Sequence, residues 1–235
     1  MVFRTPSVSN SESTRIHFDR QLKRVQHDVL RMGALVETSC QFARQALFDR
    51  DLDAADLIIL QDRKIDELYR QIEEDCVSMI ALQSPVSQDL RLLSALMHLV
   101  RDLERIGDYA KNLGDVSVRL FPYPDSPHLD QMSVMFDRCR ALLAVSLKAL
   151  SDLDAKTAAA MYKQDDAIDA DYNVFIPYLL RKVALSGLLS RSSYPSWRFG
   201  TLSAWAITQP TLGSGFDTLL QANGKFTSTM RSEIP

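Results

Sequence analysis

Eight oxygen-bearing side chains recur along this chain at the three- and four-residue steps of a helix. They are Asp62, Asp66, Glu104, Asp108, Asn112, Asp115, Asp165 and Asp169. Residues at these steps share one face of a helix. Two such faces opposed across a helical bundle would form an oxygen-rich groove of the kind that binds hard cations. The pattern predicts a metal site on oxygen ligands, and the absence of histidine disfavours an oxidase-type di-iron centre.

The metal that would occupy such a site is left open by the sequence. Oxygen ligands suit a divalent or trivalent ion, and the candidates are Mg²⁺, Ca²⁺, Mn²⁺, Zn²⁺ and iron. No metal is also a possibility, because a solvated helix face carries the same residues. Acidic pairs four residues apart arise about four times by chance in a chain of ordinary composition, and this chain has four.

Basic neighbours could neutralise the carboxylates without a metal. The candidates are Arg63, Arg101, Arg105 and Lys111. Two features favour a site over a solvated face. The Asp-x-x-x-Asp step is repeated, and Gly107 lies in mid-helix, where glycine costs about 1 kcal/mol relative to alanine. A close approach of two helices is one reason to tolerate that cost.

Other catalytic chemistry is weakly supported. His27-Asp28 is a lone pair without the further partners of a metal phosphohydrolase, and His98 lies near the apolar face of its helix, where we expect it to be packed. The glycine-rich phosphate loops GxGxxG and GxxxxGK[ST] are absent. No catalytic motif of a known class is therefore recognisable in these residues.

Long helices must position these side chains. Apolar residues spaced by three or four predict five of them, over about 14–48, 53–84, 85–121, 129–150 and 153–185. Asp49 to Asp53 form a turn with N-cap candidates. Ser84 is predicted to cap the third helix, with Pro85 at its first position. Because no strand pattern occurs in residues 1–185, we predict an all-α fold.

The chain repeats itself at an offset of 103 residues. Residues 46–82 match residues 149–185 at 12 of 37 positions, including both Asp pairs, which predicts tandem three-helix bundles. We expect a disordered segment at 1–14, a first bundle at 15–121 and the first two helices of a second bundle at 128–185. Residues 186–235 are rich in Ser, Thr, Gly and Pro and lose the repeat. We expect a divergent or frameshifted tail that leaves the second bundle incomplete.

Composition excludes several classes of protein. The 235 residues contain 27 basic and 30 acidic side chains, a net charge of −3, which argues against nucleic-acid binding. No apolar run reaches the roughly 18 residues of a membrane-spanning helix, and the N-terminal residues contain no apolar secretory segment. The cysteines are three in number and far apart. We expect reduced thiols and a cytoplasmic protein.

Two segments resemble the PhoU family of phosphate-signalling and phosphate-transport regulators. They are LVRDLERIGDYAKNL at 99–113 and DRKIDELY at 62–69, and QDDAIDADYN at 164–173 is a weaker match. The resemblance covers about residues 15–185 and includes the duplicated three-helix plan, which is also similar to spectrin repeats. A second copy of the family's (E/D)RxxDxAxN motif is missing after Leu185.

The resemblance implies metal binding by E(D)xxxD motifs. Glu104 and Asp108 match the motif on the last helix of the first repeat. Asn112 and Asp115 continue along the same face of that helix. Asp62 and Asp66 match the motif on its middle helix. Asp165 and Asp169 match the same position in the second repeat.

The resemblance also implies a function without turnover. It suggests a cytoplasmic, homodimeric negative regulator that links the ATPase subunit of a phosphate ABC transporter to a sensor histidine kinase and reaches the membrane only through these partners. Two alternatives stay open from the residues themselves. One is a metal-dependent helical phosphohydrolase that uses the same carboxylates to activate water, and the other is a metal-free structural helical protein.

Overall fold

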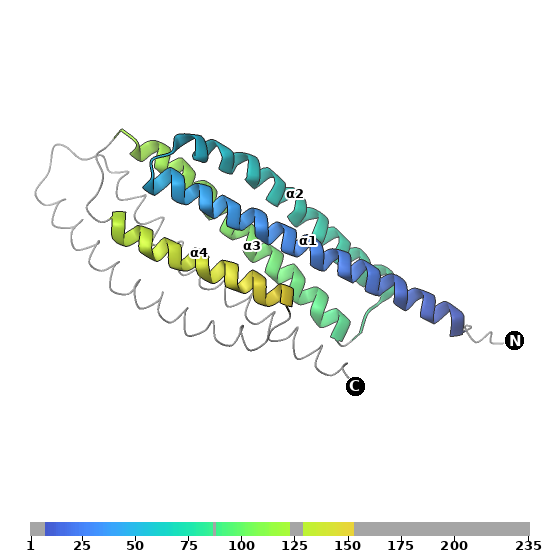
Figure 1. Ribbon diagram of the computed structural model, residues 1–235. Coiled ribbons are helices and arrows are strands. Elements are labelled where there is room, and N and C mark those ends of the chain that lie inside the picture. The colour runs from blue at the N-terminus through green and yellow to red at the C-terminus, as the bar shows by residue number, and fades with distance from the viewer. Residues whose placement is uncertain (1–7, 87, 123–128, 153–235) are drawn as a thin grey trace, which may run out of the picture.

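The fold of this chain is taken from a computed structural model that describes residues 8–86, 88–122 and 129–152 (Figure 1). Every regular element in these ranges is an α-helix. The helices are α1 (Val8–Phe48), α2 (Leu52–Gln83), α3 (Gln88–Leu120) and α4 (Leu129–Asp152). The described residues contain no strand, so the all-α prediction is confirmed for them.

The first three helices form an up-and-down bundle. Short connections join α1 to α2 and α2 to α3, so that neighbouring helices run antiparallel (Figure 1). Their apolar residues recur at three- and four-residue steps and face one another in a single core. Fully buried members of that core include Val29, Met32, Val36, Ile58, Ile65, Ile72, Leu96, Leu99 and Leu103.

Asp51 fixes the start of α2. Its side chain accepts hydrogen bonds from the backbone N–H groups of Asp53 at 3.0 Å and Ala54 at 3.2 Å. These contacts satisfy donors that the first turn of a helix leaves without partners. The predicted acidic turn between the first two helices is therefore confirmed, as is the end of α1 at Phe48.

Two predicted boundaries were wrong. α1 begins at Val8 and not near Thr14, because the apolar stripe that reveals a helix in sequence can end before its backbone hydrogen bonds do. Ser84 does not cap the third helix. It ends α2 in the left-handed conformation with φ 47°, its N–H donates to the Ile80 carbonyl at 3.1 Å, and α3 starts only at Gln88.

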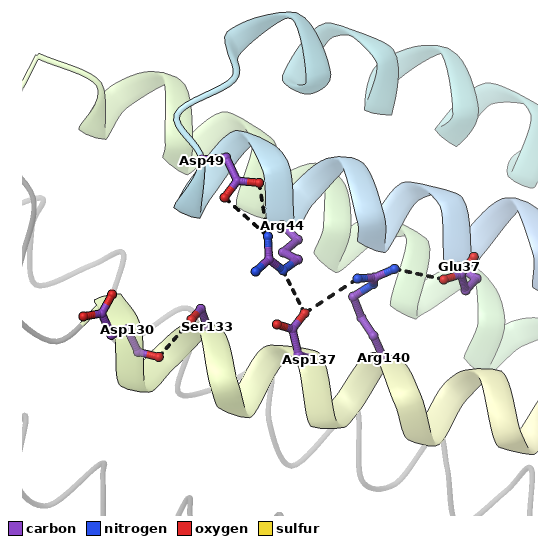
Figure 2. Close-up of polar contacts among 7 residues, drawn as sticks. All are labelled: Glu37, Arg44, Asp49, Asp130, Ser133, Asp137 and Arg140. Carbon is purple, nitrogen blue, oxygen red and sulfur yellow. Dashed lines mark hydrogen bonds and ion pairs between the residues drawn. The ribbon is translucent and has the colours of Figure 1, made fainter.

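The fourth helix packs on α1, and Figure 2 shows the polar contacts between them. Arg44 of α1 donates to Asp137 at 2.8 Å, and Arg140 of α4 donates to Glu37 at 3.0 Å. A Cβ atom at Gly33 would lie 2.3 Å from Cδ2 of Leu147, so any larger residue there would force the Leu147 side chain to move. Among the described helices, α1 is the only one that α4 contacts.

The predicted fourth helix at 129–150 is confirmed by α4. The predicted fifth helix, the rest of the second bundle to residue 185 and the tail at 186–235 lie outside the described residues. Within the described ranges, no helix combines the length and the apolar character needed to cross a membrane.

Candidate functional site between α2 and α3

Asp62 occupies a core position of α2. The buried residues Ile58, Asp62 and Ile65 follow one another at steps of four and three, which is the spacing of the face that packs against the bundle. A carboxylate at such a position loses its hydration, and this is costly unless a positive group or hydrogen bonds compensate it. The contacts made by Asp62 are therefore the centre of the site.

Glycines bring α3 close to α2 on both sides of Asp62. A Cβ atom at Gly114 would lie 2.9 Å from Cδ1 of Ile58, and one at Gly107 would lie 3.2 Å from Cδ1 of Ile65. The expectation that Gly107 marks a close helix approach is confirmed. Asp62 lies between these two contacts in α2, so it faces the turn of α3 between the two glycines.

Lys111 arises from that turn and pairs with Asp62. Its Nζ atom donates a hydrogen bond to Oδ2 of Asp62. This hydrogen bond raises the pKa of Lys111, and the charges of Asp62, Asp108 and Asp66 raise it further. The Lys111 side chain keeps 40% of its surface exposed, whereas that of Asp62 keeps 6%. The Lys111 side chain therefore lies between a buried carboxylate and solvent.

Three more carboxylates adjoin this pair. Burial raises the pKa of Asp66, and the charges of Asp62 and Asp108 raise it further. Burial also raises the pKa of Glu104, and the charges of Asp108 and Asp66 raise it further. A hydrogen bond to Asp108, which only the protonated Glu104 can donate, acts in the same direction. We call Asp62, Asp66, Glu104 and Asp108 the acidic cluster.

The cluster makes the stability of the metal-free chain depend on pH. The pKa of Glu104 is higher in the folded state than in the unfolded chain. The stabilisation that this shift gives the fold is therefore complete below the ordinary pKa of about 4.3. It is lost as pH rises through the raised pKa of the folded state. Glu104→Gln should therefore raise Tm at pH 7 and leave it unchanged below about pH 4. Thermal unfolding with a chelator present measures both.

The matched control for this prediction is Glu67→Gln. Glu67 is an exposed glutamate on α2 that does not contribute to the raised pKa of Glu104, so its substitution removes the same charge without relieving Glu104. An equal gain in Tm from both variants at pH 7 would show that net charge, and not repulsion within the cluster, is responsible.

Tyr69 and Glu73 extend the polar face of α2 beyond the predicted residues. Burial raises the pKa of Tyr69, and the charges of Glu73 and Glu104 and a hydrogen bond to Glu73 raise it further. Glu73 was not among the predicted site residues. Its signal was present, because Glu73 follows Tyr69 by four residues and so shares its helix face.

The structure brings together four of the eight predicted residues. Asn112 and Asp115 are exposed on α3, and neither is among the groups that shift the pKa of Asp66 or Glu104. Asp165 and Asp169 lie outside the described residues. The three- and four-residue spacing correctly put the four α3 residues on one helix face, but only part of that face meets α2.

The predicted basic neighbours also differ in whether they reach the acidic cluster. Of the four basic candidates, Lys111 contacts the cluster, whereas Arg101 pairs with Asp102 at 3.3 Å. Arg63 and Arg105 are exposed. His98 is exposed as well, so the expectation that it would be packed was wrong.

The donor set of the acidic cluster fits a hard cation in its chemistry. It offers only carboxylate oxygens. Burial raises the pKa of Asp66 and of Glu104, and the charges of the neighbouring carboxylates raise both further. The side chains are not preassembled as ligands. Within residues 8–86, 88–122 and 129–152, no group of three or more His, Cys, Asp or Glu side chains is arranged to hold an ion.

Comparisons with known proteins agree on one family. The PhoU domain matches residues 29–116. A relative from Synechocystis, a phosphate-specific transport system accessory protein PhoU homolog, is 47% identical over 166 residues, which cover 71% of this chain and 73% of the relative. The accessory protein PhoU of Escherichia coli is 28% identical over 163 residues, covering 69% of this chain and 68% of its own.

Solved structures give the same result. The crystal structure of PhoU from Pseudomonas aeruginosa has a TM-score of 0.74 at 25% identity and covers 92% of this chain and 99% of its own. The phosphate transport system regulatory protein PhoU from Streptococcus pneumoniae has a TM-score of 0.68 at 25% identity and covers 93% and 99%.

Proposed function

The chain belongs to the PhoU family, and from that membership we propose that it is a negative regulator of phosphate uptake and of phosphate-regulon signalling. The observation that carries the proposal is the 47% identity to a phosphate-specific transport system accessory protein. The similar solved structure described as a phosphate transport system regulatory protein supports the regulatory part. Neither description names a catalytic activity, which supports a role in binding without turnover.

The proposed mechanism is that of an adaptor. The chain would bind the ATPase subunit of the phosphate ABC transporter and a sensor histidine kinase, as a cytoplasmic homodimer that reaches the membrane through these partners. Its affinity for one partner would depend on the state of the other, and this dependence couples transport to kinase output. The accessory role named for the relatives supports the link to the transporter.

One end of the bundle supports a protein-binding role. Leu57, Ile59 and Leu60 of α2 and Val118 and Phe121 at the end of α3 expose 40–52% of their surface. The contact of Gly114 with Ile58 places the end of α3 beside the start of α2. Exposed apolar side chains of this kind would gain free energy by burial against another protein.

The acidic cluster is the proposed metal site. Asp62, Asp66, Glu104 and Asp108 would hold a divalent cation, which would neutralise their charge and join α2 to α3. The support is the chemistry of the donor set, together with the burial and the neighbouring negative charges that raise the pKa of Asp66 and Glu104. The candidate residues on α3 that are exposed, Asn112 and Asp115, have no part in this proposal.

Complementation tests the regulatory function directly. Alkaline phosphatase activity in high phosphate should rise in a strain that lacks this gene, because repression of the regulon is lost. Expression of the full 235-residue chain should return the activity to the level of the parent strain. The Asp108→Ala chain, expressed to the same level, tests whether the acidic cluster is needed.

Each other outcome has a separate meaning. Derepression that this chain does not reverse would leave the family assignment intact but contradict the regulatory competence of this polypeptide. Unchanged phosphatase activity after deletion would overturn the phosphate proposal. Release of phosphate from generic phosphoesters by the purified chain, lost in Asp108→Ala, would favour the hydrolase alternative.

A further inference from the structure

We propose that Cys40 of α1 and Cys139 of α4 are a redox-sensitive pair, which a peroxide converts to a disulfide that fixes α4 on the three-helix bundle. The inference concerns how the fourth helix is joined to the first three. It depends neither on the phosphate proposal nor on the proposed metal site.

Two ion pairs that join α1 to α4 enclose one cysteine on each helix. They are Glu37–Arg140 at 3.0 Å and Arg44–Asp137 at 2.8 Å (Figure 2). Cys40 lies within the α1 segment 37–44, and Cys139 lies within the α4 segment 137–140. Because both ion pairs bridge the same two segments, these segments lie against each other.

Each cysteine also shares the helix face through which its helix contacts the other. Cys139 follows Phe136 by three residues, and the Phe136 ring lies 5.8 Å from a phenylalanine ring of α1. Cys40 follows Gly33 by two helical turns, and a Cβ atom at Gly33 would collide with Leu147 of α4. Such close packing suits a disulfide, whose Cα atoms lie within about 7 Å of each other.

The two thiols are protected while α4 is packed on α1. Cys40 is 8% exposed and Cys139 6%, and both belong to the same core cluster. Burial raises the pKa of Cys40 to about 12, which the charge of Arg140 partly offsets, and Glu37 and Cys139 raise it further. A protonated thiol is a poor nucleophile. The pair therefore stays reduced until a movement of α4 admits the peroxide.

The reaction consumes one peroxide molecule and releases two waters. One thiol loses its proton and attacks the peroxide, the O–O bond breaks, and a sulfenic acid forms as the first water leaves. The second thiol then attacks the sulfenic sulfur. The S–O bond breaks, the S–S bond forms, and the proton of the second thiol leaves with the second water. The peroxide receives the two electrons that the sulfur atoms lose.

Peroxide treatment of the full-length chain tests the pair. Reduced protein is freed of reductant, treated with excess hydrogen peroxide, and digested without reduction for peptide mapping by mass spectrometry. We expect Cys40 and Cys139 to be linked within one chain, and dithiothreitol to reverse the link. Cys76 is the internal control, because it is buried in α2 and α4 contacts no described helix other than α1. It should remain a thiol.

Thermal unfolding tests whether the disulfide fits the native packing. The oxidised wild type should melt about 5–15 °C above its own reduced form, because the cross-link closes the long loop between the two helices. Cys76→Ser should show the same gain. Cys139→Ser should show none, since it lacks one of the two sulfur atoms.

Two results on the wild type alone would overturn the inference, so that neither serine variant has to fold. One is a chain in which Cys40 and Cys139 remain unlinked after prolonged peroxide treatment, or form disulfides only between chains. The other is a linked chain that melts no higher than the reduced chain, because its disulfide would then not hold α4 in its native place.

Discussion

Replacing Asp108 by alanine should weaken Mn²⁺ binding to the full-length chain by about ten- to a hundredfold while the helices stay folded. Asp108 is exposed, so its truncation removes no core packing. Its charge raises the pKa of both Asp66 and Glu104, which places it within electrostatic reach of the two. The pKa of Glu104 should fall toward its ordinary value in the same variant. Calorimetric titration and a pH titration followed by NMR measure these effects.

The control for Asp108→Ala is Asp115→Ala. Both residues are exposed aspartates on α3, but Asp115 does not contribute to the raised pKa of Asp66 or Glu104. We expect Asp115→Ala to leave Mn²⁺ affinity within about twofold, since solvent and salt screen exposed charges. Equal losses in the two variants, or an unchanged metal content in folded Asp108→Ala, would contradict the proposed site.

Replacing Leu103 by alanine should lower the free energy of unfolding by about 2–5 kcal/mol. Leu103 is 0% exposed at the centre of α3, so truncation removes buried methyl groups and leaves a cavity that the surrounding helices fill only in part. A loss of this size is a large fraction of the 5–15 kcal/mol that is typical of a domain. Urea unfolding followed by circular dichroism measures it.

Leu60→Ala is the matched control for the core. Leu60 is 52% exposed on α2, and we expect its truncation to change stability by no more than about 0.5 kcal/mol. A loss at Leu60 as large as that at Leu103 would mean that the outer face of α2 is buried in solution. The oligomeric state of the purified chain would then need to be measured before either value is interpreted.

The helices were largely predictable because their signals are local. Apolar residues three and four apart located the last helical residue of α1 at Phe48 and the extent of α4 to within a few residues. The acidic turn before α2 was predicted from residue type, and Asp51 caps the helix there. Polar residues carry no such stripe, which is why the start of α1 at Val8 was missed.

The candidate site was predictable only in part. Sequence spacing placed Glu104, Asp108, Asn112 and Asp115 on one stripe, but it could not say how far that stripe faces the neighbouring helix. The structure joins Glu104 and Asp108 to the aspartates of α2 and leaves the other two exposed. Lys111 was one of four basic candidates, and only the fold distinguished it from Arg101.

There is a physical reason why the sequence predicts some of these features and only the tertiary structure decides the others. The sequence by itself determined that residues 15–121 form long helices, that carboxylates follow their faces and that the chain resembles the PhoU family. Tertiary structure decided which of those carboxylates meet a lysine. That choice depends on the rotation and axial offset of α2 against α3, which are set where Ile58 and Ile65 pack on Gly114 and Gly107. Helical periodicity is a property of neighbours in sequence, whereas this offset depends on contacts between residues about 40 to 60 positions apart.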